Sequence, residues 1–331
     1  MENKFDSYVE ELKSSKEWLD LDSLRKKTLK LYVFSWFLGV VLFILAFVIL
    51  IFSFDLISFL GCLVVSVAIP LMLVRKHLKE FSAKYKGIVV PKLISDVITD
   101  FDSNADRDSN SNSSKQRKNK CQYYPNEKIN FNLLASFPLF ERYPHKKTIY
   151  DGEDLFKGTI GETHFQFSDL IIKRNRDLIV VDQDFDFTIF RGLVFIADFH
   201  KDFDGTTTIR TRKGKQYRLL KALGSRITTI SHQFDQMFTV HTTDEITARY
   251  LLPANMLERV MALRSIFPDK GIAICLHKGK LIISIHKHDF FEIGKASMPR
   301  SRNIVQTYTE ISAILEMIDV LNLNLRIWNK K

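Results

Sequence analysis

Two long uncharged stretches dominate the hydrophobic pattern of the first third of the chain. Residues 31–52 read LYVFSWFLGVVLFILAFVILIF and residues 56–74 read LISFLGCLVVSVAIPLMLV, with three residues between them. A helix rises about 1.5 Å per residue, so each stretch matches the hydrocarbon core of a bilayer, which is about 30 Å thick. A stretch of this length that is apolar on every face is typical of a membrane span. The pattern predicts a two-helix transmembrane hairpin over 31–74.

Basic residues flank both stretches and predict how the hairpin is oriented. The flanking Lys and Arg are Arg25, Lys26, Lys27 and Lys30 before the first stretch, and Arg75, Lys76, Lys79, Lys84 and Lys86 after the second. Because short cytoplasmic flanks carry an excess of Lys and Arg, both termini are expected on the cytoplasmic side. About thirty residues precede the first stretch and no small-residue cleavage site follows it, which disfavours a cleaved signal peptide.

Three more polar segments surround the predicted hairpin. Residues 1–30 place apolar side chains at helical spacing among charges, which predicts a juxtamembrane amphipathic helix. Residues 75–101 predict a cytoplasmic helical connector with a bend or restart at Pro91, since the residue before a proline disfavours helix. Residues 102–120 hold no apolar side chain larger than Ala105, so they predict a disordered polar linker.

Residues 121–331 have the pattern of a cytoplasmic α+β domain. Short runs of β-branched and aromatic residues predict strands over 158–167, 178–182, 188–199, 206–212, 216–220 and 238–241. Further on, the pattern predicts a helix over 245–266 interrupted near Pro253, a β-hairpin over 272–286 and a final helix over 304–321. Strands followed by helices favour antiparallel strands over βαβ units.

Cysteine usage and charge exclude several classes of protein. The only cysteines of the 331-residue chain are Cys62, Cys121 and Cys275, too far apart for a paired zinc site or a disulfide framework. The net charge is +10, from 48 Lys and Arg against 38 Asp and Glu. Basic residues of the predicted domain include Lys173, Arg174, Arg176, Arg210, Arg212, Lys213, Lys215 and Arg218. Without a recognised module, this charge favours anionic lipid headgroups over nucleic acid as a partner.

The strongest candidate in the sequence for a catalytic or binding group consists of Asp244, Glu245 and Arg249. A structural reading explains all three, because Thr242 or Thr243 can cap a helix there and acidic residues favour its first turn. Glu245 and Arg249 are also spaced to pair on one helical face. A catalytic or partner-binding role for the three residues is the open alternative, and His241 would be an added acid or base.

Two histidines are the weak metal candidates. His286 and His288 alternate along a predicted strand and would share one face, but no third ligand is evident. Asp198, Asp202 and Asp204 lack the full pattern of a calcium loop. The sequence contains no G-x-S-x-G, Walker A or dinucleotide motif. We therefore expect no cofactor.

Three stretches resemble a known family. They are Tyr150–Asp154 with Gly158–Gly161 and Phe167–Asp169; Phe190–Phe199 with Phe203 and Gly205; and Phe234, Phe238 and Val240 with Thr243–Glu245 and Ala248–Pro253. The closing segment Leu323–Trp328 also fits. The chain is similar to bacterial membrane proteins grouped as a domain of unknown function, number 3137. This resemblance implies a bacterial integral-membrane protein with a cytoplasmic domain, and it implies no activity.

Together these observations favour a non-catalytic protein of the bacterial inner membrane. Its cytoplasmic domain would bind an unidentified protein or anionic lipid headgroups. Two alternatives from other classes stay open: a membrane-tethered hydrolase that uses Asp244, Glu245 and Arg249, and an exported effector that inserts into host membranes.

Overall fold

A computed structural model of the chain describes residues 16–53, 56–108, 119–140, 148–174, 188–199, 203–212, 223–268, 270–286 and 308–315. The chain forms two compact units. One unit comprises residues 1–90 with 292–305, and the other comprises residues 91–291 with 306–331.

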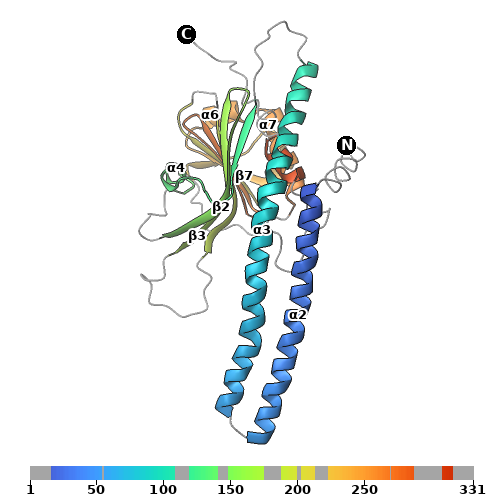
Figure 1. The fold of residues 1–331 in the computed structure, drawn as a ribbon. Helices are drawn as coiled ribbons and strands as arrows, with labels where there is room; N and C mark the ends of the chain where they lie inside the picture. The colour runs from blue at the N-terminus through green and yellow to red at the C-terminus, as the bar shows by residue number, and fades with distance from the viewer. Residues whose placement is uncertain are drawn as a thin grey trace. The chain divides into compact units, whose positions relative to one another are not determined.

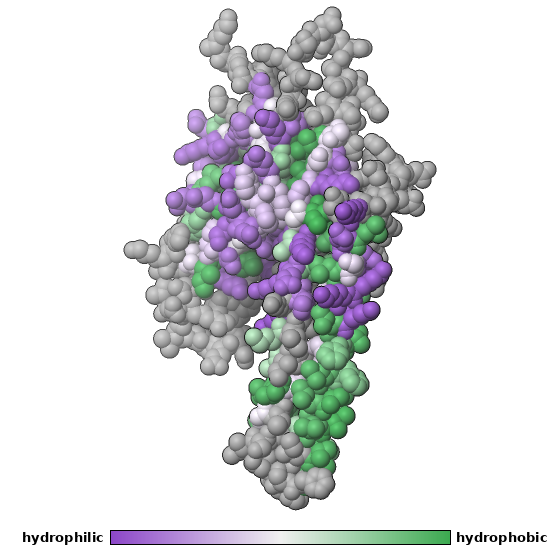
Figure 2. Space-filling model, viewed as in Figure 1, coloured by the Kyte–Doolittle hydropathy of each residue, from purple (hydrophilic) through white to green (hydrophobic). Residues whose placement is uncertain are grey.

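Helices alone form the described part of the first unit (Figure 1). α2 spans Lys16–Ser53 and α3 spans Leu56–Asp108, so both uncharged stretches are helical. Apolar side chains of α2 lie on its surface, and Figure 2 shows such side chains gathered along the helical segment. Val33, Phe34 and Phe37 are between 60% and 67% exposed. Only Lys16–Lys30 of the predicted amphipathic segment is described, and it continues directly into the apolar stretch.

α3 is longer than the sequence pattern predicts, which corrects two expectations. The helix continues through Pro91 without the predicted restart. Proline costs a helix about 3 kcal/mol, but burial of Leu93, Ile94 and Val97 on one face stabilises the turns that follow. The helix ends only at Asp108, so residues 102–108 are helical where we expected a disordered linker. Residues 109–118 lie outside the described part of the chain.

The second unit is built on one large antiparallel sheet, which confirms the α+β class. Its strands are β1 Lys120–Tyr124, β2 Thr148–Ile160, β3 Thr163–Arg174, β4 Thr188–Asp198, β5 Thr206–Thr211, β6 Ser225–Ile227, β7 Phe238–Thr242, β8 Ile272–His277 and β9 Lys280–His286. Their order is β1-β2-β3-β4-β9-β8-β5-β7-β6, and every neighbouring pair is antiparallel. The β8–β9 hairpin thus lies between β4 and β5.

Short helices accompany the sheet: α4 Phe131–Ala135, α5 His232–Met237, α6 Glu245–Leu251 and α7 Ala254–Ile266, with a further helical segment at 308–315. The predicted break near Pro253 is confirmed, because this residue is the N-cap of α7. The hairpin over 272–286 is also confirmed. Its turn residues Lys278 and Gly279 both have positive φ, as a two-residue turn between twisted strands requires.

One predicted strand is wrong, and several predictions are not tested. Residues 158–167 form the end of β2, a two-residue turn and the start of β3 rather than one strand, since Ile160 pairs with Thr163 and Gly161 adopts a φ of 59° between them. The predicted strands at 178–182 and 216–220 lie outside the described residues, as do the ends of the predicted last helix.

Packing of the sheet differs between its two faces. On one, which we call the aromatic face, Phe156 and Phe167 stack with ring centroids 4.2 Å apart, and Phe195 continues the row. On the other, which we call the opposite face, Ile196, Ile282 and Cys275 form a row in register. The opposite face is covered over β2, β3 and β4 by α4 and the residues after it: Leu134, Phe137, Leu139 and Phe140.

Candidate functional site

The first predicted group lies at the start of α6 and has a structural role there. Asp244 is the N-cap of the helix, rather than Thr242 or Thr243, and its carboxylate accepts hydrogen bonds from the Ile246 N–H and the Thr247 hydroxyl. The Thr247 hydrogen bond is the main cause that lowers the pKa of Asp244. Thr242 supports the cap, because its hydroxyl donates to the Asp244 carbonyl at 2.8 Å.

Glu245 and Arg249 form the predicted ion pair along the same helix. The Arg249 Nη2 lies 2.7 Å from Glu245 Oε1, and Arg249 Nε lies 3.1 Å from the same oxygen. Both side chains are about half exposed, at 52% and 54%. The geometry is thus that of a solvated i,i+4 pair.

The structure describes only one of the two histidine candidates, His286. His286 ends β9, and its Nδ1 lies 2.7 Å from the Arg191 carbonyl oxygen, to which it can donate a hydrogen bond. His288 lies outside the described residues. Within the described ranges, no group of three or more His, Cys, Asp or Glu side chains is placed to hold a metal ion. Asp198, at the end of β4, pairs instead with Lys280 at 2.7 Å.

A buried tyrosine–carboxylate pair was not predicted. Asp154 lies at a β-bulge of β2 with a φ of 59°, is 1% exposed, and accepts a hydrogen bond from the Tyr123 hydroxyl. Glu153 and Asp169 are directly opposite each other beside it. Burial, followed by the charge of Asp154, raises the pKa of Tyr123. Sequence alone could not show the bulge, because Asp rarely adopts the left-handed conformation that glycine favours.

Polar residues gather at the other end of the sheet, on the opposite face. Along one row, Arg226 of β6 pairs with His241 of β7, which pairs with Thr208 of β5. In the neighbouring row, Arg210 of β5 pairs with Thr239 of β7. Directly opposed residues share a face of the sheet. We call Arg210, Arg226 and His241 the basic cluster.

Burial distinguishes the members of the basic cluster. Arg226 is exposed, whereas Arg210 and His241 are half-buried. Burial lowers the pKa of Arg210 to about 10. Burial is also the main cause that lowers the pKa of His241, and the charges of Arg210 and Arg226 lower it further. The buried thiol of Cys275, which follows Thr208 in the row, has a pKa raised to about 12 and is therefore a poor nucleophile.

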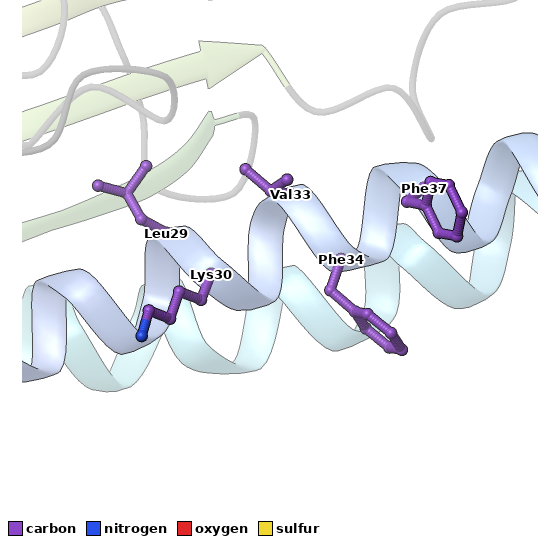
Figure 3. Close-up of a pocket in the computed structure, with 5 residues that line it drawn as sticks. All are labelled: Leu29, Lys30, Val33, Phe34 and Phe37. Carbon is purple, nitrogen blue, oxygen red and sulfur yellow. The ribbon is translucent and has the colours of Figure 1, made fainter.

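A shallow groove lies on the first unit, along α2 (Figure 3). Its lining is Leu29, Lys30, Val33, Phe34 and Phe37. Four apolar side chains and one lysine therefore lie along α2 where its basic flank passes into its uncharged stretch. Among the described residues, the one helix long and apolar enough to cross a membrane contains this groove and spans Trp18–Val48, with a mean hydropathy of 2.6.

Comparison with known proteins finds a similarity over the C-terminal part of the chain. A family model described as a protein of unknown function (DUF3137) matches residues 188–323, and this is the family that the sequence stretches resemble. The match covers β4 to β9 with α5, α6 and α7, and it includes two of the three resembling stretches. No curated protein and no solved structure matches the chain. The family description names no activity.

Proposed function

We propose that this chain is an integral protein of the bacterial inner membrane. α2 and the first part of α3 would span the bilayer as a hairpin. The second unit, which contains the sheet and is called the sheet unit below, would act as a non-catalytic module on the cytoplasmic side. The module would bind another protein or anionic lipid headgroups. The observation that carries the proposal is the apolar surface of α2, where Val33, Phe34 and Phe37 are mostly exposed.

An apolar surface of this extent is stable when other apolar groups cover it. Transfer of apolar surface out of water is worth roughly 25 cal/mol per Å², so the exposed side chains of α2 favour a hydrocarbon environment. The basic residues before α2's apolar stretch and after that of α3 support two cytoplasmic flanks. Lys30, which lines the groove of Figure 3, would contact lipid phosphates at the membrane surface.

Alternative functions account for fewer observations. An apolar helix near the N-terminus is also what a signal sequence contains, but about thirty residues precede this stretch. A hydrolase acting through Asp244, Glu245 and Arg249 would have to release these side chains from the cap and the ion pair. Neither alternative explains why a second uncharged stretch follows at once in α3.

Alkaline phosphatase fusions test the proposed topology, because this reporter is active only outside the cytoplasm. We expect a fusion after Phe54 to be active and a fusion after the C-terminal Lys331 to be inactive. An exported domain behind a signal sequence, or a single span, would make the C-terminal fusion active. That result would overturn the hairpin and the cytoplasmic location together.

A further inference from the structure

The groove on α2 lies between two rows of side chains. Leu29, Val33 and Phe37 follow one another at intervals of four residues, and Lys30 and Phe34 form the neighbouring row. Side chains four residues apart form a ridge along a helix, and a groove separates adjacent ridges. Figure 3 shows Leu29 and Val33 on one side of the helix and Lys30 and Phe34 on the other. The volume of the groove is about 500 Å³, more than ten times the roughly 30 Å³ of a water molecule, so it has room for an extended ligand.

The groove faces away from the buried side of α2. Leu21, Thr28 and Ser35 are buried, and because they recur every seven residues they form one row along the helix. An α-helix turns by about 100° per residue, so Ser35 and Phe37 are about 200° apart and point to nearly opposite sides. Val33 is 64% exposed and Phe37 is 67% exposed. The groove is therefore on the side of the helix whose apolar side chains are open to a ligand.

Polarity changes along the groove in the same order as in one leaflet of a bilayer. Lys30 is the last basic residue before the uncharged stretch. Phe37 follows seven residues later, which is about 10 Å along the helix at 1.5 Å per residue. The groove thus presents a cation at one end and aromatic and aliphatic groups over the rest. An anionic phospholipid has the matching order of a charged phosphate followed by hydrocarbon, whereas a small soluble anion matches only one end.

The charge of Lys30 is available to such a ligand. Two other basic residues of the same flank share one carboxylate, because Arg25 Nε and Lys26 Nζ lie 2.7 and 2.9 Å from oxygens of Asp22. Lys30 is exposed and forms no ion pair with any residue that the structure describes. Its ammonium group therefore favours a ligand with a net negative charge over a zwitterionic one.

A second copy of the chain is the competing occupant of the groove, and charge disfavours it. Copies that lie in one bilayer share one orientation, so packing of groove against groove would place the two Lys30 side chains beside each other. Lys27, one turn earlier on the same flank, would add to this repulsion. Like charges repel more strongly at the low dielectric of a membrane than in water. The same lysine that repels a second copy attracts an anionic lipid.

We propose that the groove of α2 binds one anionic phospholipid of the cytoplasmic leaflet. The phosphate of the lipid contacts the Lys30 ammonium group, and one acyl chain lies between Val33 and Phe34 and reaches Phe37. The aliphatic stem of Lys30 covers the start of this chain while its charged end meets the headgroup. This inference rests on the proposed function, because the groove meets lipid only if α2 lies in the bilayer. It adds a single site with a preference for a negatively charged headgroup.

Native mass spectrometry of the full chain in detergent micelles tests the headgroup preference. The chain is titrated separately with phosphatidylglycerol and with phosphatidylcholine of the same acyl chains, and we expect one phosphatidylglycerol per chain to bind more tightly. Lys30→Gln should weaken phosphatidylglycerol binding about fivefold, which corresponds to the roughly 1 kcal/mol of one basic residue at an anionic surface. Phosphatidylcholine binding should not change. Lys79→Gln makes the same change on the basic flank of α3, outside the groove, and should bind as the wild type does.

A second pair of variants tests the hydrocarbon part of the site. Phe34→Ala removes one wall of the groove and should lower the fraction of chain that retains phosphatidylglycerol. Phe43→Ala removes another exposed ring of α2 that does not line the groove, and it should leave this fraction unchanged. Equal retention by these two variants would contradict the position of the acyl chain.

The outcomes separate failure of the lipid site from failure of the anchor. Equal binding of the two lipids, or equal binding of phosphatidylglycerol by Lys30→Gln and Lys79→Gln, would overturn the site and leave the hairpin intact. A lipid-free species with twice the mass of one chain would show that a second copy occupies the groove instead. If the anchor itself is wrong, the chain stays soluble after the detergent is removed and retains neither lipid, which overturns the proposed function together with the site.

Discussion

α2 and the sheet are both rich in phenylalanine and aliphatic residues, yet they place these side chains in opposite environments. Phe34 and Phe37 of α2 are 60% and 67% exposed, whereas Phe156, Phe167 and Phe195 of the sheet are fully buried. Sheet residues find their partners in neighbouring strands, as the 4.2 Å stack of Phe156 on Phe167 shows. The same residue types therefore form a packed core in the sheet and an exposed apolar surface on α2.

Removal of one aromatic ring from each region gives the largest contrast. Phe167→Ala should lower the free energy of unfolding by about 3–5 kcal/mol, because it leaves a cavity in a fully packed row. Phe34→Ala, the matched change on α2, should have almost no effect in detergent, since that ring packs against solvent or lipid. Pulse proteolysis in urea measures both variants. Equal destabilisation would show that α2 is packed like the sheet.

A charge in the centre of α2 should impair membrane integration. Ile44→Arg places a guanidinium in the hydrocarbon core, at a cost of about 3 kcal/mol on insertion scales. The fraction of chain recovered in membranes should fall accordingly. Ile246→Arg makes the same change on α6, where the side chain is 83% exposed, and should leave recovery unchanged. If Ile44→Arg is integrated as well as the wild type, α2 does not lie in the bilayer.

A substitution of Thr242 tests how much a buried polar side chain contributes to the stability of the sheet unit. Its buried hydroxyl donates to the Asp244 carbonyl and accepts from the Asp244 N–H at 3.1 Å. Thr242→Val should therefore cost about 1–3 kcal/mol in unfolding free energy, the penalty of buried groups left without a partner. Thr228→Val, at an exposed position, should change it by less than about 0.5 kcal/mol. Similar urea midpoints for the two variants would show that the hydrogen bonds of the Thr242 hydroxyl do not stabilise the fold.

The smallest expected effect is a pH dependence of the sheet unit. The pKa of Asp244 is lowered in the folded chain, chiefly by the Thr247 hydroxyl. The stability that this carboxylate contributes is therefore present above its unfolded pKa and is lost as the pH falls through its folded pKa. Asp244→Asn and Thr247→Val should each flatten the fall of the urea midpoint in acid. If the urea midpoint of both variants falls with decreasing pH as steeply as that of the wild type, Asp244 does not contribute to the pH dependence.

The sequence pattern predicted those helices and turns that are determined by residues close together in the chain. The uncharged stretches, the break at Pro253 and the turn at Lys278 and Gly279 all follow from composition and backbone preference. The turn at Gly161 was missed because β-branched and aromatic residues continue on both sides of it. α3 runs past Pro91 because burial of its apolar face outweighs the proline, and a local pattern does not report that burial.

The candidate sites depend more strongly on distant pairing. Asp244 and the Glu245–Arg249 pair were predictable as a helix start, because capping and i,i+4 contacts are local. The basic cluster was not, since Arg226 and His241 meet only through the register of β6 with β7. In the sequence, Arg210 was one of several basic residues, and nothing there indicated that it faces the same side as His241.

Alkaline carbonate extraction of cell membranes tests the central claim most directly, when combined with the intact mass of the recovered chain. This treatment releases peripheral proteins and retains those that span the bilayer. The account predicts that the full-length chain stays in the membrane pellet and that Ile44→Arg shifts part of it to the supernatant. A soluble chain, or one shortened at its N-terminus by cleavage after the apolar stretch, would contradict the proposed anchor.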